Sequence, residues 1–170
     1  KYDKAYEFNK RSEEIRIKSS GIDNPSLVEI YNSYALIHFY KEEYEKAITY
    51  YEKAYQLCLK YVGKDHTFLK AAERGLSETN WVMGNTKEGF KLSKNIALWA
   101  LNESEKIFSF LSEIEKENYY NANLEGNISR FNSYAVQEKD ESSEAMYNIQ
   151  LAYKGILMQC SKKLKTRILN

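Results

Sequence analysis

The chain has 170 residues, of which 43% are hydrophobic and 29% are charged, a composition typical of a protein that buries a core. Its formal net charge of +1 provides no overall field that would favour nucleic acid or an anionic membrane surface. One proline and seven glycines favour long helices, because proline removes a helical hydrogen bond and glycine costs backbone entropy. We therefore predict an all-α fold with short connections.

The sequence contains no uninterrupted apolar run of about 18 residues, so we predict no membrane-spanning segment. It opens at Lys1 without an initiator methionine and without a hydrophobic signal segment, so we expect a piece of a longer protein and predict no compartment. Cys58 and Cys160 form neither a disulfide framework nor a CxxC pair, and both fall on apolar helix faces. We interpret them as inert core thiols.

The first hundred residues repeat with a period of 42. Matching positions are Tyr2, Lys4 and Ala5 with Tyr44, Lys46 and Ala47, and Gly21 and Asp23 with Gly63 and Asp65. A second step of 42 relates Phe39 to Trp81 and Tyr44 to Thr86, and it puts Gly89 at the position of Ala47. A small residue therefore recurs where two helices must approach closely.

The repeat and its apolar spacing predict one lone helix followed by two antiparallel helix pairs. The expected helices cover residues 2–19, 24–40, 43–62, 66–83 and 86 to about 102. In the connectors, Gly21 and Gly63 suit the left-handed conformation that ends a helix. Asp23 or Asn24, and then Asp65, can cap the helix that follows.

The stretch from Asn32 to Ala54, NSYALIHFYKEEYEKAITYYEKA, alternates large residues with alanines and resembles the tetratricopeptide repeat (TPR) pattern. The long period and the G-x-D-[HN]-P-like connector resemble the kinesin-light-chain type of repeat, although Thr67 departs from the proline expected there. The resemblance implies a right-handed α-solenoid, whose concave groove is lined by the first helix of each pair and holds a peptide or protein partner.

In this register, seven residues of the first helices are expected to line the groove: Glu29, Asn32, Leu36, Phe39, Arg74, Glu78 and Trp81. The Asn32 amide suits a peptide main chain because it can donate and accept together. Alternatively it bonds its own helix or water. Phe39 and Trp81 can instead be packing residues.

After residue 102 the repeat is lost, and we divide the chain into a TPR array (1–102) and a helical extension of two long helices (103–170). Ser112 and Glu115 predict a capping box that starts the first of these helices, with IFSFL before it as either a helix end or an extended link. Its expected apolar stripe is Ile114, Tyr119 or Tyr120, Leu124, Ile128, Phe131 and Ala135.

A charged loop, EKDESS, is expected next, and then a last helix capped by Ser142 or Ser143. Its predicted apolar face consists of Ala145, Ile149, Ala152, Tyr153, Ile156, Cys160, Leu164 and Ile168. Four basic residues follow on this helix, Lys162, Lys163, Lys165 and Arg167. Their charge complements a helix C-terminus, and the alternatives are docking to a further domain or to nucleic acid.

The segments IFSFLSEIEKENYY and LAYKGILMQCSKKLKTRIL resemble the helical region upstream of the CHAT domain in bacterial TPR-CHAT proteins, over roughly Ile107–Leu169. That resemblance implies that the parent protein carries a caspase-like cysteine peptidase domain. The family's catalytic histidine and cysteine lie in the CHAT domain itself, so they do not transfer to His38, His66 or the two cysteines here. We therefore predict no catalytic residue in this part.

Two isolated histidines cannot supply a metal site, and no GxGxxG or GxxxxGK[ST] motif occurs, so we predict no metal and no cofactor. Our first hypothesis is a non-catalytic scaffold that binds a protein or peptide, with no nucleic acid and no membrane as partner. Docking to a C-terminal domain of the same protein is a further expected contact. The alternative is a structural module that self-associates through Tyr2 or Ile15.

Overall fold

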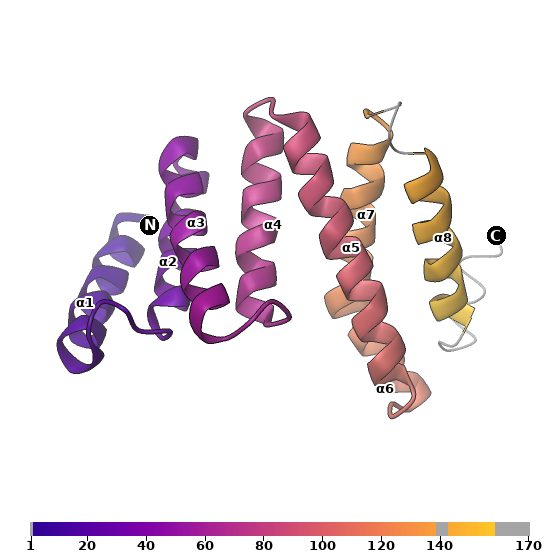
Figure 1. Cartoon of the computed structure of the whole chain (residues 1–170), viewed down its shortest axis with the longest axis horizontal. Helices are drawn as coiled ribbons and strands as arrows, with labels where there is room; N and C mark the ends of the chain where they lie inside the picture. Colours follow the sequence, from indigo (N-terminus) through magenta and orange to yellow (C-terminus); the bar gives the residue numbers. More distant parts are fainter. Residues whose placement is uncertain (1, 139–142, 159–170) are drawn as a thin grey trace. The chain divides into compact units, whose positions relative to one another are not determined.

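The computed structural model describes residues 2–138 and 143–158, and every regular element in these ranges is a helix. The all-α prediction is therefore confirmed for the described residues (Figure 1). The chain divides into two compact units, Lys1–Leu92 and Ser93–Asn170. The predicted division at residue 102 marks the end of the sequence repeat, whereas the two units are compact regions of the structure. The division at residue 102 therefore stays a prediction.

The first unit contains the five predicted helices of the repeat region, the last of them in part. They are α1 (Tyr2–Ser20), α2 (Leu27–Tyr40), α3 (Tyr44–Tyr61), α4 (Thr67–Val82) and the start of α5 (Thr86–Phe108). Within this unit α2 packs against both α1 and α3, and α4 packs against α3 and α2 (Figure 1). Each predicted helix is present, with small differences at the ends.

The α2–α3 hairpin closes around small side chains. Ala47 and Ala54 of α3 are fully buried, so the backbone of α3 approaches its neighbours closely. Large side chains fill the space on both sides, and Tyr34 of α2 is 1% exposed. Burial of one large apolar side chain contributes about 1.5–3 kcal/mol to stability. The alternation of large and small side chains therefore both positions and stabilises the hairpin.

The two long connectors use glycine as predicted. Gly21 and Gly63 have φ angles of +81° and +109°, a backbone region that residues with a side chain rarely adopt. Asn24 accepts a hydrogen bond from the Ser26 amide at 2.9 Å, just ahead of α2. The prediction of Asp65 as the cap of α4 is wrong, because the helix begins one residue later and His66 accepts from the Phe68 amide instead.

Gly89 is the small residue predicted at the contact between α4 and α5. A Cβ atom at this position would lie 3.0 Å from the Ser77 carbonyl oxygen and 3.1 Å from the Trp81 amide nitrogen. The hydroxyl of Ser77 also donates to the Gly89 carbonyl at 2.7 Å. The two helices therefore touch backbone to backbone here, as the repeat predicts.

Helix α5 ends at Phe108, so the expected end near Asn102 is wrong. The buried face of α5 continues beyond Asn102. Leu101 is buried just before that residue, and Ser104 and Phe108 are buried after it. The Ser104 hydroxyl bonds the carbonyl of Ala100 one turn earlier, so this polar residue does not interrupt the stripe. Of the IFSFL segment, Ile107 and Phe108 end this helix, Ser109 and Phe110 form a turn, and Leu111 has no regular structure.

The second unit contains the remainder of α5, then α6 (Glu113–Tyr119), the π-helical segment η1 (Tyr120–Leu124), α7 (Glu125–Ala135) and α8 (Ser143–Met158). The predicted capping box is present: Ser112 accepts from the Glu115 amide at 3.4 Å, and the Ser112 amide donates to Glu115 Oε2 at 2.8 Å. One long helix was expected after it. The sequence pattern did not predict the wider turn of η1.

The stripe predicted for this helix is correct from Tyr120 onward. Its buried members are Tyr120, Leu124, Ile128, Phe131 and Ala135. Ile114 is 73% exposed, so its assignment to the stripe is wrong. It precedes Tyr120 by six residues, which on a helix of about 3.6 residues per turn puts it on a different face.

Helix α8 starts at Ser143, and Ile149 and Ile156 of its predicted face are fully buried. Its Tyr153 stacks on Tyr120 of η1, with ring centroids 5.9 Å apart, and the two hydroxyl groups are hydrogen bonded. Several predictions lie outside the described residues. These are residues 139–142 of the EKDESS loop (138–143), Ser142 as a cap, Cys160, Leu164, Ile168 and the four basic residues of 162–167.

Candidate functional site

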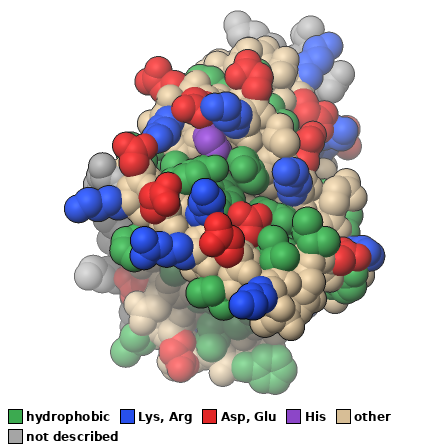
Figure 2. All heavy atoms as spheres, turned by 90° about the vertical axis from the view of Figure 1, so that its left-hand side faces the viewer, with side chains coloured by type: hydrophobic (Ala, Val, Ile, Leu, Met, Phe, Trp, Pro, Cys, Tyr) green, Lys and Arg blue, Asp and Glu red, His purple; other side chains and the backbone are tan. Residues whose placement is uncertain are grey.

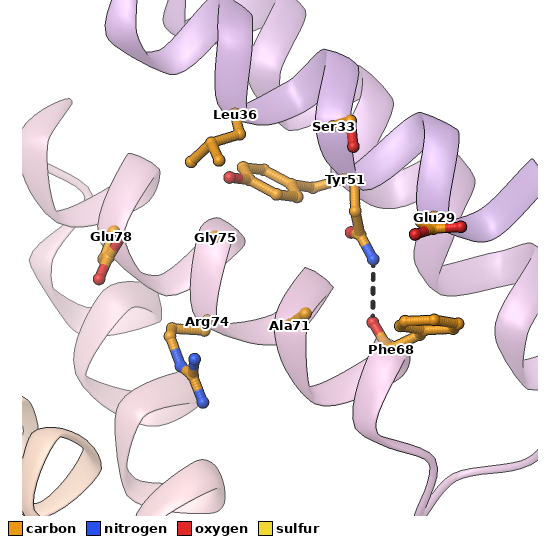
Figure 3. Close-up of a pocket in the computed structure, with 10 residues that line it drawn as sticks. Glu29, Ser33, Leu36, Tyr51, Phe68, Ala71, Arg74, Gly75 and Glu78 are labelled. Atoms are coloured by element: carbon orange, nitrogen blue, oxygen red, sulfur yellow. Dashed lines mark hydrogen bonds between the residues drawn. The ribbon is translucent and has the colours of Figure 1, made fainter. Parts of the chain in front are cut away.

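A groove of about 330 Å³ lies within the first unit, between α2 and α4, with α3 beneath them. Figure 3 shows its walls converging from these helices. From α2 come Glu29, Asn32, Ser33 and Leu36; from α3 comes Tyr51; from α4 come Phe68, Ala71, Arg74, Gly75 and Glu78. Two consecutive first helices thus face each other across one second helix.

Tyr51 forms the floor of the groove and is 5% exposed. Its ring occupies the space that a side chain at Gly75 would need, since a Cβ atom there would lie 2.0 Å from the ring's Cζ. In Figure 3 the Tyr51 ring extends between Leu36 and Gly75. Burial raises the pKa of the Tyr51 hydroxyl, and the carboxylate of Glu78 raises it further, so this hydroxyl stays protonated.

Asn32 joins the two walls of the groove. Its Nδ2 donates to the Phe68 carbonyl oxygen at 3.1 Å, the interaction that Figure 3 marks with a dashed line. Its Oδ1 is buried and has no hydrogen-bond partner among the described residues. The Asn32 amide is therefore only half satisfied. A buried carbonyl oxygen without a hydrogen-bond partner costs about 1–3 kcal/mol of stability.

The remainder of the lining combines apolar and charged groups. Leu36 and Phe68 are 45% and 41% exposed, which is high for large apolar side chains. Oε2 of Glu29 lies 3.4 Å from Nη2 of Arg16 on α1, and 60% of the Glu29 side chain is exposed. Arg74 and Glu78 come from successive turns of α4. The groove can therefore contact both apolar and charged groups of a ligand.

The chain matches the tetratricopeptide repeat family over residues 1–58 and again over residues 26–88. These overlapping matches cover more than half of the chain. The chain belongs to the TPR family. A comparison with curated proteins gives no match.

TPR repeats mediate protein–protein interactions, and a TPR domain is non-catalytic. The Cys58 thiol and the two histidines of this domain take part in packing and helix contacts. Burial raises the pKa of the Cys58 thiol, which disfavours the reactive thiolate. His38 and His66 are engaged in helix contacts, with Glu43 and the Phe68 amide respectively.

Among the described residues, no three side chains of the types that hold metal ions come together. None of the described helices is both long enough and apolar enough to cross a bilayer.

Five of the seven predicted TPR groove residues line this groove: Glu29, Asn32, Leu36, Arg74 and Glu78. Phe39 and Trp81 are not part of its lining. The Phe39 ring packs edge-on against Tyr44 at 5.7 Å, and Trp81 adjoins Gly89 of α5. The alternative stated for Asn32, a bond to its own helix or to water, did not include the observed bond to the next repeat.

The sequence analysis missed the other half of the lining: Ser33, Tyr51, Phe68, Ala71 and Gly75. Phe68, Ala71 and Gly75 share a helical face with Arg74 and Glu78, so the 3.6-residue periodicity contained a signal for them. Tyr51 lies on a second helix, whereas only the first helix of each pair was expected to line the groove. It reaches the groove only because Gly75 opposite it has no side chain.

Proposed function

We propose that this TPR domain binds an extended peptide segment of a partner protein in the groove between α2 and α4. The observation that supports this most directly is the half-satisfied amide of Asn32, whose Oδ1 lacks a partner among the described residues. A peptide N–H group that bonds this oxygen removes the cost of the unpaired acceptor. Because the recognised group belongs to the main chain, this contact accepts any residue except proline.

The size of the groove favours an extended strand over a helix. Its volume of about 330 Å³ lies at the low end of the range of about 300–1,000 Å³ found for ligand pockets. A short stretch of extended chain fits such a space, with its side chains alternating between the groove and solvent. Leu36 and Phe68 then contact apolar side chains of the peptide. Glu29 favours basic side chains of the peptide, and Arg74 favours acidic ones.

Phe39 and Trp81 remain part of this proposal. They follow Leu36 and Glu78 by three residues on α2 and α4, so a longer ligand that continues along the same helices would reach them next.

We infer further that the domain is the N-terminal sensor of a longer bacterial TPR-CHAT protein with kinesin-light-chain-type repeats. The support is the 42-residue period and the sequence resemblance over Ile107–Leu169, of which 139–142 and 159–169 lie outside the described residues. In such a protein the catalytic part would be the CHAT peptidase. Partner binding would regulate it only by favouring one arrangement of the helices that follow the repeats over another.

The groove can be tested without knowledge of the natural partner. Peptides selected from a random peptide library on the wild-type protein would be titrated against Asn32→Ala and Arg74→Ala by fluorescence anisotropy. We expect Asn32→Ala to weaken binding about tenfold, which corresponds to one hydrogen bond of about 1.4 kcal/mol. Asn102→Ala, which removes an exposed asparagine of the second unit, is the matched control and should leave binding unchanged.

N-methylation of single peptide amides tests main-chain recognition directly. One N-methyl position should weaken binding to the wild type but cause little further loss in Asn32→Ala, because both changes remove the same hydrogen bond. Equal affinity of the wild type and Asn32→Ala for every selected peptide would contradict the proposal.

A further inference from the structure

Helix α4 begins at a hydrogen bond made by a histidine side chain. Nδ1 of His66, the residue before the helix, accepts from the Phe68 amide at 3.2 Å. The carbonyl oxygen of His66 accepts from the Leu69 amide at 3.0 Å. The first amides of a helix have no partner within the helix, so these two bonds hold the first turn of α4 in place.

The preceding repeat has the same cap with a different side chain. Asn24 stands 42 positions before His66 and precedes α2. Its Oδ1 accepts from the Ser26 amide at 2.9 Å, and its carbonyl oxygen accepts from the Leu27 amide at 3.0 Å. Equivalent residues therefore make the same pair of hydrogen bonds, through a side-chain amide in one repeat and an imidazole in the next.

Only the imidazole loses this function when it takes up a proton. A neutral imidazole has one nitrogen that accepts a hydrogen bond, whereas a protonated imidazole has two donors and no acceptor. Protonated His66 would point an N–H group at the N–H group of Phe68. It would also place a positive charge at the N-terminus of α4, where the helix dipole disfavours it. The Asn24 amide takes up no proton, so the cap of α2 is unchanged.

Mild acidification changes few other groups in this chain. Histidine is the side chain that ordinarily titrates between about pH 5 and pH 8, and the sequence contains two. The formal net charge is +1 with both histidines neutral, and Figure 2 shows acidic and basic side chains intermixed over one face of the protein. A pH effect in this range therefore arises at individual histidines and not from an overall field.

The other histidine, His38, has a partner of the opposite kind. Its Nδ1 lies 2.8 Å from Oε2 of Glu43, a carboxylate that also pairs with Lys46 at 2.8 Å. A carboxylate accepts a hydrogen bond from a neutral or a protonated imidazole, so protonation keeps this contact. Acidification therefore removes a hydrogen bond at His66 and none at His38.

The charged residues around His66 do not replace the lost bond. The titratable side chains in the connector and at the nearby ends of α2, α3 and α4 are Lys64, Asp65, Glu29, Lys60, Tyr61, Lys70 and Glu73. None of them forms an ion pair with His66 within the described part of the chain. Asp65 favours a protonated neighbour and Lys64 opposes it, and both are exposed, so solvent and salt weaken their effects.

The first turn of α4 is part of the groove wall. Phe68 lines the groove, and its carbonyl oxygen accepts from Nδ2 of Asn32 at 3.1 Å (Figure 3). The rings of His66 and Phe68 also touch, with centroids 5.1 Å apart. Loss of the cap therefore loosens the turn that positions both the Phe68 ring and the acceptor of the Asn32 amide.

We propose that His66 is a pH-sensitive cap, whose protonation releases the first turn of α4 and weakens the binding of a peptide in the groove. The domain holds its ligand near neutral pH and releases it in a mildly acidic environment. Release of the turn is a property of the fold. Only the effect on the ligand rests on the function proposed above for the groove.

Urea unfolding of the first unit, followed by the amide NMR signals of α2 and α3, tests the cap without any ligand. His66→Asn gives the second repeat the amide cap of the first. It should match the wild type near pH 8, because asparagine is a good cap. Near pH 5.5 the unfolding equilibrium constant of the wild type should be about fivefold larger than that of His66→Asn. His38 and all carboxylates are common to both proteins, so their titration cancels.

Two further variants separate the cap from its surroundings. His66→Ala has no cap at any pH, so the wild type should be about fivefold more stable than it near pH 8 and no more stable near pH 5.5. Asp65→Asn removes the neighbouring carboxylate and is the control. It should lose stability on acidification as the wild type does.

Peptide binding tests the link to the groove. Library-selected peptides without histidine are titrated by fluorescence anisotropy against the wild type and His66→Asn near pH 8 and pH 5.5. We expect acidification to weaken binding to the wild type about fivefold more than binding to His66→Asn.

The outcomes of the two measurements are distinct. Equal loss of stability on acidification in the wild type and His66→Asn would overturn the pH-sensitive cap. Equal loss of affinity in the two proteins, with the stability difference present, would overturn its control of the groove. A wild type that binds no selected peptide at either pH would contradict the proposed function of the groove, and the unfolding data alone would then decide the cap.

Discussion

Gly75 of α4 lies directly over the ring of Tyr51 of α3, so closely that a Cβ atom on Gly75 would fall 2.0 Å from the ring's Cζ. Glycine inside a helix costs about 1 kcal/mol relative to alanine. The chain tolerates that cost here because the ring then packs against the backbone of α4 itself. This contact sets how closely the two repeats approach and how deep the groove between them is.

Replacement of Gly75 by alanine should therefore destabilise the first unit in spite of the gain in helix propensity. Overpacking a core costs about 1–3 kcal/mol and the gain in helix propensity is about 1 kcal/mol, so we expect a net loss of up to about 2 kcal/mol in the free energy of unfolding by urea. Gly126→Ala is the control, because nothing lies within 4 Å of a Cβ atom there. It should stabilise by about 0.5–1 kcal/mol, and a similar gain for Gly75→Ala would disprove the tight contact.

The capping box of α6 predicts a pH dependence. Hydrogen bonds from the Ser112 hydroxyl and amide lower the pKa of Glu115 below its usual 4.5. A carboxylate whose pKa is lower in the folded state stabilises the fold above its unfolded pKa, and this contribution is lost as pH falls through the folded pKa.

The stability difference between the wild type and Ser112→Ala should thus be largest above pH 4.5 and shrink below it. NMR titration of the Glu115 carboxyl carbon checks the cause. Its midpoint should lie below 4.5 in the wild type and move up in Ser112→Ala. An identical midpoint in the two proteins would show that Ser112 does not lower this pKa.

Phe131 of α7 is fully buried within the second unit. Truncation to alanine removes that burial and leaves a cavity, so Phe131→Ala should cost about 3–5 kcal/mol in the unfolding of this unit. Phe110→Ala provides the comparison, since Phe110 is 87% exposed and its loss should change stability by less than about 0.5 kcal/mol. Equal effects of the two substitutions in a urea titration would refute the assigned core.

The Cys58 thiol is fully buried between α3 and its neighbours, and burial raises its pKa. Iodoacetamide should therefore alkylate Cys58 only after the first unit opens. Mass spectrometry of tryptic peptides measures this at one site. Labelling of the native protein as fast as in urea would contradict the burial of Cys58.

The sequence alone determined the helical hairpins of this TPR protein and their order. Proline is nearly absent, and a small residue recurs after 42 positions, as Ala47 and then Gly89. Gly21 and Gly63 follow the ends of helices. Local backbone chemistry therefore specifies where each helix forms. The capping box of Ser112 with Glu115 could be predicted for the same reason, because all its groups lie within one turn.

Only the tertiary structure decided which side chains share the groove. Asn32 bonds Phe68, which is 36 residues away, and Tyr51 reaches the groove from α3, although only first helices were expected to line it. Helical periodicity indicates which face of a helix is apolar. It does not indicate which residue of another helix that face meets, because this depends on the distance between helices set by contacts such as Gly75 on Tyr51.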